Sequence, residues 1–225
     1  MRKLISFALA GAVLLPTGAH AQAVVSATAG FMSQYYYRGI LQKESSANAG
    51  LSVAASGFTA GTWAADVGDG SEVDLFASYA IPAGSGSVSL GGTGYFYTGD
   101  FDNTYLEGNL GAAFGPLSIA AALGTYDVPG DPKYAYIGVT AAQNGLFATV
   151  GTIAFNSGFG DALSDAFDPD LGGQYLQAGY NFSAAELDFS ISGLWNDMVL
   201  NGLYEGVDEQ TLIFTVSKAF TIPTS

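Results

Sequence analysis

The stretch from Ser71 to Ile81, SEVDLFASYAI, alternates between two kinds of side chain, residue by residue. One set is apolar and consists of Val73, Leu75, Ala77, Tyr79 and Ile81. The intervening set is mostly polar and consists of Glu72, Asp74, Phe76 and Ser78. Because successive side chains of a β-strand point to opposite faces of a sheet, this period of two predicts a strand with one apolar face.

The same alternation recurs along the chain and predicts about twelve strands, each close to the length of about 9–11 residues that a tilted membrane strand needs. It is clearest in 71–81, 186–195 and 209–220, and weakest in the Ala/Gly-rich segments 47–55 and 116–126. The predicted strands are 24–36, 47–55, 58–66, 71–81, 86–97, 104–114, 116–126, 134–142, 146–155, 174–182, 186–195 and 209–220.

The predicted connections alternate between short and long. The short turns are Ser56-Gly57, Pro82 to Ser85, Gly115, Gln143 to Gly145, and Ser183 to Ala185. The long connections are 37–46, 67–70, 98–103, 127–133, 156–173 and 196–208. Outer-membrane barrels have this asymmetry, with short periplasmic turns and longer external loops. An even number of strands also places both chain ends on the periplasmic side.

The composition favours a membrane barrel over other classes. Hydrophobic residues make up 49% of the chain and charged residues only 12%, with 31 glycines, 13 tyrosines and 15 phenylalanines. The mean hydropathy is +0.29, yet no long apolar run follows Leu15. A membrane β-barrel fits this combination, because only every second residue of its strands needs to be apolar.

The N-terminus has the three parts of a secretory signal peptide. Arg2 and Lys3 form a basic region, Leu4 to Leu15 is apolar, and Ala19-His20-Ala21 supplies a small-x-small cleavage site. We therefore expect residues 1–21 to be removed on export, which leaves 22–225 as a single barrel domain. This predicts a location in the bacterial outer membrane.

The predicted mature chain lacks the residues that many functions need. His20 is the only histidine and lies in the signal peptide, and the chain has no cysteine. These absences argue against Ser-His-Asp and Cys-His catalysis and against zinc sites, so we expect neither an enzyme nor a cofactor. Loss of Arg2 and Lys3 lowers the net charge from −14 to −16, which argues against nucleic-acid binding.

Four motifs resemble the TorF family of porins, also called Gcw_chp. Ser33 to Ile40, SQYYYRGI, resembles the family's "SDYxFRGxSQ" opening, although Gln34 replaces the usual Asp and Leu41 interrupts the Ser-Gln that often follows. Gly61-Thr62-Trp63 resembles its "GxW" strand, and Tyr105-Leu106-Glu107 resembles a later "nyxE" strand. Glu72 to Tyr79 resembles its "EvDlyaGY" strand. The resemblance covers mainly the first hundred residues and implies a barrel with a porin role.

Lumen-facing side chains determine the chemistry of a barrel channel, since the outer face meets only lipid. With the apolar face outward, the charged candidates for the lumen are Arg38, Glu72, Asp74, Glu107, Glu186 and Asp188. Five of them are acidic, which predicts a preference for cations. We expect Arg38, Glu72 and Asp74 to form a charged constriction near the external mouth. Alternatively, Arg38 forms a structural salt bridge in a filled lumen.

The connection 156–173 is long for a turn and rich in aspartate. Asp165, Asp168 and Asp170 are weak calcium candidates, because they lack the alternating third acid and bidentate Glu of an EF-hand. A solvated acidic loop that meets divalent cations at the lipopolysaccharide surface is the preferred interpretation. The same loop is also long enough to fold inward as a constriction.

Aromatic residues near the predicted strand ends, Tyr35, Tyr37, Trp195 and Phe220, are expected to form the girdle at the bilayer interface. Together these features predict an outer-membrane, porin-like channel for passive diffusion of small solutes or ions, with outer-membrane lipid and lipopolysaccharide as its surroundings. The alternative is a closed barrel without pore activity, whose acidic surface loops bind a partner.

Overall fold

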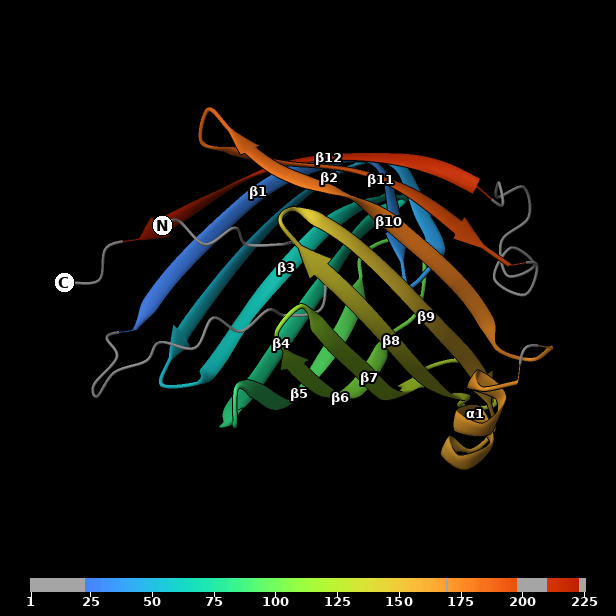
Figure 1. The fold of residues 1–225 in the computed structure, drawn as a ribbon. Helices are drawn as coiled ribbons and strands as arrows, with labels where there is room; N and C mark the ends of the chain where they lie inside the picture. Colours follow the sequence, from blue (N-terminus) through green and yellow to red (C-terminus); the bar gives the residue numbers. More distant parts are fainter. Residues whose placement is uncertain (1–22, 169, 198–209, 223–225) are drawn as a thin grey trace.

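The computed structural model describes residues 23–168, 170–197 and 210–222. It shows a closed barrel of twelve antiparallel strands and one short helix, α1 (Phe159–Ala166) (Figure 1). The predicted signal peptide, 1–21, lies outside the described residues. Within the described part of the chain, no helix is long and apolar enough to cross a membrane.

All twelve predicted strands are confirmed, most of them within one or two residues at each end. They are β1 (Val24–Tyr37), β2 (Ile40–Ala55), β3 (Phe58–Gly68), β4 (Gly70–Ala83), β5 (Gly86–Tyr97), β6 (Tyr105–Phe114), β7 (Leu117–Tyr126), β8 (Lys133–Gln143), β9 (Leu146–Asn156), β10 (Gly173–Ala184), β11 (Leu187–Asn196) and β12 (Gln210–Ile222). The Ala/Gly-rich strands β2 and β7 are therefore formed as well, and β2 begins well before the predicted residue 47.

The barrel closes between the first and last strands. Each strand pairs with its neighbours in the chain, and β1 pairs antiparallel with β12 from Val25↔Ile222 to Met32↔Thr215. Closure leaves no sheet edge, so the backbone groups of the wall are paired within the protein, as the interior of a bilayer requires.

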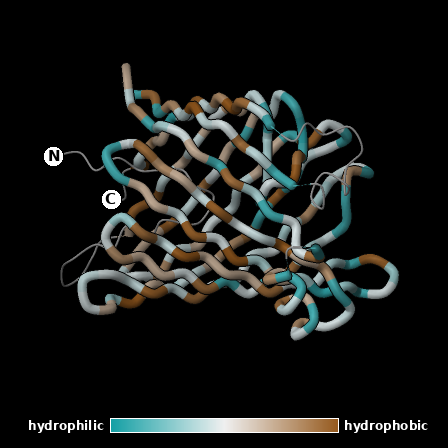
Figure 2. Tube along the Cα trace, turned by 45° about the vertical axis from the view of Figure 1, so that its right-hand side comes forward, coloured by the Kyte–Doolittle hydropathy of each residue, from teal (hydrophilic) through white to brown (hydrophobic). Residues whose placement is uncertain are grey.

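The outer face of the wall is apolar. In β4, Leu75, Tyr79 and Ile81 are exposed outward, whereas Glu72 and Asp74 are buried on the inner face. The same arrangement holds in β12, where Leu212 is 71% exposed. Figure 2 shows hydrophobic and hydrophilic residues alternating along the strands. Large exposed apolar side chains on a closed sheet are stable in lipid, so this is a transmembrane barrel.

One end of the barrel, here called the turn end, carries the two-residue turns 56–57, 84–85, 115–116, 144–145 and 185–186. In three of these turns both residues have positive φ, as in Asn144 (φ 54°) and Gly145 (φ 87°). Such turns match the twist of the strands they join, and Asn-Gly adopts them readily. The described ends of β1 and β12 also lie at this end.

The opposite end, here called the loop end, corrects two predictions. The connection predicted at 37–46 is a two-residue turn, Arg38-Gly39, and the one at 67–70 is the single residue Asp69 between β3 and β4. The polar run from Arg38 to Ser46 looks like a loop because it is charged, but most of it pairs with β1. The strict alternation of short and long connections is therefore wrong.

Helix α1 also corrects an expectation. Its buried residues, Ala162 and Ala166, pack against Ala135 of β8 and Ala154 of β9, which face outward from the wall. Figure 1 shows α1 outside the barrel at its loop end. The described part of the connection from 156 to 173 thus folds onto the outside of the barrel and forms no constriction.

Candidate functional site

The distal part of the β1–β2 hairpin leaves the wall of the barrel. β1 pairs with β12 only as far as Met32, and β2 pairs with β3 only from Asn48 onward. Beyond these residues the two strands pair only with each other, up to Tyr37↔Ile40. We call residues 33–47 the distal hairpin. In Figure 1 its ribbon turns inward across the loop end of the lumen.

Local sequence explains why this hairpin bends. The turn residues Arg38 and Gly39 both have positive φ, 50° and 83°, which suits a tight hairpin. The register shifts between Tyr35 and Tyr36, and Ser45 has a φ of 63° within β2. Bulges and such backbone conformations bend and twist a strand pair, so they redirect the distal hairpin away from the wall.

Side chains replace the lost backbone ladder at the base of the distal hairpin. On the β12 side, the backbone N–H of Phe214 donates to Ser33 Oγ at 2.9 Å. On the β3 side, Ser46 Oγ donates to the carbonyl oxygen of Asp66 at 2.7 Å, and Lys43 forms an ion pair with the Asp66 carboxylate. At its base the distal hairpin is therefore attached to its neighbours by side-chain contacts and not by a backbone ladder.

Arg38, at the tip of the distal hairpin, binds the opposite wall. Its Nη1 and Nη2 donate to the two carboxylate oxygens of Glu107 on β6 at 2.8 and 2.9 Å. The guanidinium also lies over the rings of Tyr37 and Tyr136, at 4.7 and 4.2 Å from their centroids. The Arg38 and Glu107 side chains are 10% and 1% exposed, so this ion pair is shielded from water, and bidentate geometry makes it strong.

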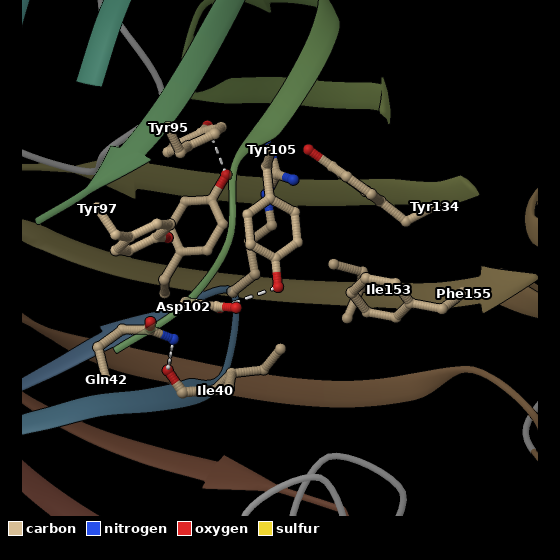
Figure 3. A pocket seen from close by; sticks show the side chains of 11 residues that line it. Ile40, Gln42, Tyr95, Tyr97, Asp102, Tyr105, Tyr134, Ile153 and Phe155 are labelled. Atoms are coloured by element: carbon tan, nitrogen blue, oxygen red, sulfur yellow. Dashed lines mark hydrogen bonds between the residues drawn. The ribbon is translucent and has the colours of Figure 1, made fainter. Parts of the chain in front are cut away.

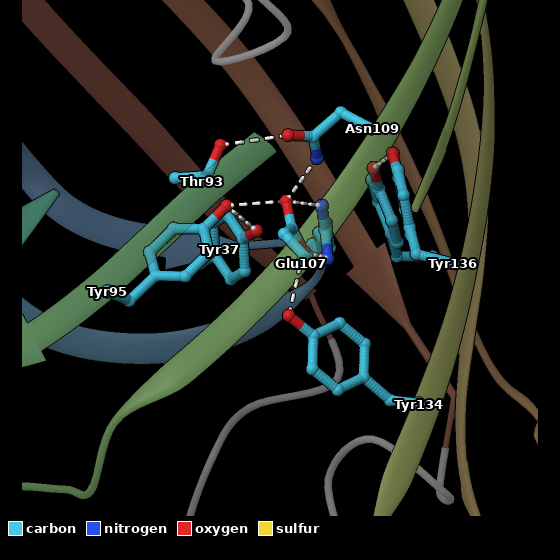
Figure 4. A network of polar contacts seen from close by, with 9 residues as sticks. Tyr37, Thr93, Tyr95, Glu107, Asn109, Tyr134 and Tyr136 are labelled. Atoms are coloured by element: carbon cyan, nitrogen blue, oxygen red, sulfur yellow. Dashed lines mark hydrogen bonds and ion pairs between the residues drawn. The ribbon is translucent and has the colours of Figure 1, made fainter. Parts of the chain in front are cut away.

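Glu107 is the centre of a larger hydrogen-bond network (Figure 4). Its carboxylate accepts hydrogen bonds from Tyr95 Oη and Tyr134 Oη, both at 2.8 Å, and from Asn109 Nδ2 at 2.5 Å. Tyr95 Oη also lies 2.6 Å from Tyr37 Oη on the distal hairpin. A buried carboxylate is costly unless all its oxygens are satisfied, and this one receives five donors in all.

Two further contacts hold the tip. Asn196 Nδ2, at the end of β11, donates to the carbonyl oxygen of Gly39 at 2.8 Å. Ile40 is buried in an apolar cluster with residues of the far wall, namely Ala122, Tyr134, Tyr136, Ile153 and Tyr175. The distal hairpin therefore crosses the lumen from its own side of the barrel and packs against strands β7 to β10.

Glycines make room for the tyrosine rings of the far wall. A Cβ on Gly124 would lie 2.2 Å from Tyr134 Cζ, and one on Gly138 would lie 2.1 Å from Tyr136 Oη. Both tyrosine side chains therefore occupy the space over a glycine of the sheet. This close approach positions the two rings to receive Arg38 and to reach Glu107.

A second acidic group lies beside this network on β4. Glu72 accepts a hydrogen bond from Tyr35 Oη at 2.6 Å. Asp74 is only 4% exposed, and its Oδ1 has no hydrogen-bond partner among the residues that the structure describes. In the register of the sheet Asp74 lies opposite Trp63 on one side and Tyr95 on the other. Among the described residues, the loop-end half of the lumen thus holds three buried carboxyl groups, those of Glu72, Asp74 and Glu107, and one guanidinium, that of Arg38.

A small cavity of about 40 Å³ lies among the same aromatic residues (Figure 3). Its lining includes Tyr97, Asp102, Tyr105 and Gln42. Asp102 accepts hydrogen bonds from Tyr105 Oη at 3.0 Å and from Tyr126 Oη at 2.6 Å. This volume is enough for only a few water molecules.

The turn-end half of the lumen has a different lining. Many of its inward positions carry small residues, although Phe147 also faces inward there; the small ones include Ser87, Ser89, Gly91, Gly111, Ser118, Gly138, Thr140, Ser190, Thr215 and Ser217. Asp188 faces inward there and accepts a hydrogen bond from Ser183 Oγ. Small side chains leave more room inside a twelve-strand barrel than the tyrosines of the loop end do, so the lumen is narrower at the loop end.

The structure brings four of the six predicted lumen residues together. Arg38, Glu72, Asp74 and Glu107 lie in the loop-end half, and Asp188 lies near the other mouth. Glu186, in contrast, belongs to the turn between β10 and β11, where its side chain is 80% exposed and pairs with Lys218. The strand predicted to start at residue 186 starts one residue later, so Glu186 does not face the lumen.

Other predicted groups are also separated. Among the described residues, no three acidic side chains lie close enough to hold a metal ion. The calcium candidates are engaged locally, since Asp165 accepts a hydrogen bond from Asn156 and Asp168 accepts one from the backbone of Asp170. The girdle prediction is wrong for Tyr35 and Tyr37, which are buried inside the barrel because they belong to the distal hairpin.

Several residues of the network were missing from the sequence prediction, notably Tyr95, Tyr134, Tyr136 and Asn196. For Tyr134 and Tyr136 the signal was the alternation in KYAYIG of β8, which places both tyrosines on the same face as the glycines. Tyrosine is equally typical of a lipid-facing girdle, so parity alone leaves its role open. Asn196 carries no local signal, because its partner Gly39 lies 157 residues away.

Solved structures share this fold. The KdgM porin aligns with 88% of this chain and 99% of its own length, at 10% identity and a TM-score of 0.54. A chain from a study of the in-meso crystallization of membrane proteins aligns with 90% of this chain and 85% of its own length, at 12% identity and a TM-score of 0.55. At such identities the likeness shows the fold alone.

No family model matches the chain. No curated protein matches it either. Membership of the TorF family therefore stays a prediction, whereas the barrel itself is shown.

Proposed function

We propose that this protein is an outer-membrane channel of the porin type, in which the distal hairpin restricts the passage of small solutes and ions. One observation carries the proposal: the narrow part of the lumen is made largely by a hairpin that has left the sheet. A barrier attached by side chains can move without breaking the wall. Behind it, the lumen is lined by small residues.

The location follows from separate observations. A closed sheet with an apolar outer face is a structure that spans membranes, and the sequence predicts export. A similar fold is described as a porin in KdgM. The motif resemblance to the TorF family supports the same role. One of the motifs that carry this resemblance, SQYYYRGI, lies in the distal hairpin. The proposal contains no catalytic step.

We further propose that the channel prefers cations. Glu107 is paired with Arg38, but Glu72 is bonded to a neutral tyrosine and Asp74 has an unpartnered oxygen. Asp188 adds a carboxylate near the other mouth. Fixed negative charge in a narrow, low-dielectric passage lowers the energy of a permeating cation and raises that of an anion.

The same network supports a second candidate, a closed barrel with no pore activity. The ion pair, the tyrosine hydroxyls and the apolar cluster around Ile40 fill the loop-end lumen. In that case the distal hairpin is a permanent part of the core, and the exposed loops carry the function.

Single-channel recording with a shortened hairpin distinguishes the two candidates. Gln34 and Glu44 are direct partners in the β1–β2 ladder. Replacing 35–43 by Asn-Gly therefore joins them through a two-residue turn and preserves the register. We expect the shortened barrel to conduct steadily in planar bilayers, with a higher conductance than the unaltered protein. Heat-modifiable gel migration shows that the fold is retained.

A matched control removes residues from the same end of the barrel without touching the lumen. Shortening the β7–β8 connection, 127–132, should leave the conductance unchanged. If the folded, hairpin-shortened barrel conducts no better than the unaltered protein, the channel proposal fails and the closed barrel remains.

A further inference from the structure

Helix α1 exposes large apolar side chains outside the barrel. Phe159, Leu163 and Phe167 are 42%, 40% and 67% exposed, and Phe167 directly follows the helix. Residues four apart lie on the same side of a helix, so these three form one apolar flank. Such a flank is unfavourable in water, which raises the question of what covers it.

The remaining sides of α1 are occupied differently. Ala162 and Ala166 face the wall of the barrel. Asp161 and Asp165 lie two residues before and after Leu163, about 200° around the helix from it. The helix therefore has a wall side, an apolar flank and an acidic flank.

Two hydrogen bonds orient these flanks. Asn156, the last residue of β9, donates from Nδ2 to Asp165 at 2.7 Å, so the acidic flank is directed toward the loop end. Thr152, further from that end of β9, donates from Oγ1 to the carbonyl oxygen of Ala166 at 2.8 Å. The apolar flank lies on the opposite side of the helix from Asp165, next to the apolar belt of the wall, and Phe159 at its start has its ring centroid 5.8 Å from Lys133 Nζ of β8.

The apolar flank is continuous with that belt. Phe159 borders a shallow depression of about 530 Å³ on the outer face of β5, β6 and β7. Gly92, Gly94 and Gly108 form part of its floor, and Leu106 and Leu123 point outward beside them. The large side chains that point outward beside it, Leu106 and Leu123, are apolar, as contact with an acyl chain requires.

We propose that α1 is a membrane anchor, whose apolar flank inserts among the lipid acyl chains at the loop end while Asp161 and Asp165 stay at the aqueous boundary. The occupant of the flank is lipid, because the flank continues an outer face that already meets lipid. The inference rests on the proposed membrane location, and it is independent of whether the lumen conducts.

The absence of cysteine from the chain makes a direct test simple. Leu163→Cys and Asp161→Cys, each carrying a nitroxide spin label, are reconstituted in phosphatidylcholine vesicles. Collisions with oxygen, which concentrates in the acyl layer, and with a water-soluble nickel chelate are then measured by power saturation. We expect the label at residue 163 to favour oxygen and the label at residue 161 to favour nickel.

Two reference labels calibrate the result. Leu75→Cys lies in the apolar belt of β4, and Asp131→Cys lies in the exposed β7–β8 connection. The proposal is overturned if the label at residue 163 is as accessible to nickel as the label at residue 131 while the label at residue 75 favours oxygen. If the label at residue 75 itself favours nickel, the membrane location fails, and the proposed anchor fails with it.

Discussion

Arg38 and Glu107 lie 69 residues apart in the chain, yet they form a bidentate ion pair across the lumen at 2.8 and 2.9 Å. Arg38 reaches this position because the distal hairpin leaves the wall, and Glu107 because β6 lies on another side of the closed barrel. The pair fastens the hairpin that restricts the lumen. It is therefore the contact from which the behaviour of the channel is best tested.

Removing one partner of this pair should destabilise the barrel. Arg38→Met leaves Glu107 buried without its cation, which we expect to cost about 3 kcal/mol in the free energy of unfolding. The double variant Arg38→Met/Glu107→Leu removes both charges and should regain most of that loss. Urea unfolding in detergent measures both values.

The control for this prediction is Lys133→Met. Lys133 pairs with Asp131, whose side chain is 71% exposed, so the expected cost is only about 0–1 kcal/mol. Equal losses in the single and double variants of the buried pair would show that the ion pair itself is not the stabilising contact.

Releasing the tip of the hairpin should open the channel more often. Asn196→Ala removes the hydrogen bond to the carbonyl oxygen of Gly39 and leaves the Arg38–Glu107 pair intact. We expect more frequent open events in single-channel records, because one of the contacts that hold the tip of the hairpin against the wall is lost. Asn181→Ala, on the inner face of β10 toward the turn end, is the matched control and should behave as the unaltered protein does.

Neutralising Asp74 should change the ion selectivity. Asp74→Asn removes one of the carboxyl groups to which the cation preference is assigned, so the permeability ratio of K⁺ to Cl⁻, obtained from the reversal potential in a KCl gradient, should fall. The control is Glu186→Gln, which removes a carboxylate from an exposed turn. If Asp74→Asn and Glu186→Gln have the same permeability ratio, Asp74 has no role in permeation.

Filling a glycine site under a tyrosine ring should disturb the network. Gly124→Ala places a Cβ 2.2 Å from Tyr134 Cζ, so the ring must shift away from Glu107. We expect a loss of about 1–3 kcal/mol in unfolding free energy. Gly108→Ala is the control, because its Cβ meets nothing within 4 Å. Similar stabilities for the two alanine variants would contradict this packing.

The alternation in sequence determined the fold. Period-two patterns such as SEVDLFASYAI located all twelve strands, and in β4 they assigned Leu75 outward and Asp74 inward correctly. This works because a strand's side-chain period is set by local backbone geometry, and because lipid outside and a lumen inside require opposite polarity at successive residues.

Only the tertiary structure decided how the lumen is filled. Arg38 was placed in a long loop because its neighbours Lys43 and Glu44 are charged, whereas β2 continues through them. That the distal hairpin leaves the sheet depends on contacts with Phe214, Asp66 and Glu107, which come from distant parts of the chain. Periodicity assigns each residue to a face of its own strand. It contains no information on which strands face each other across a closed barrel. This arrangement of the strands decided which tyrosines and carboxylates form the network.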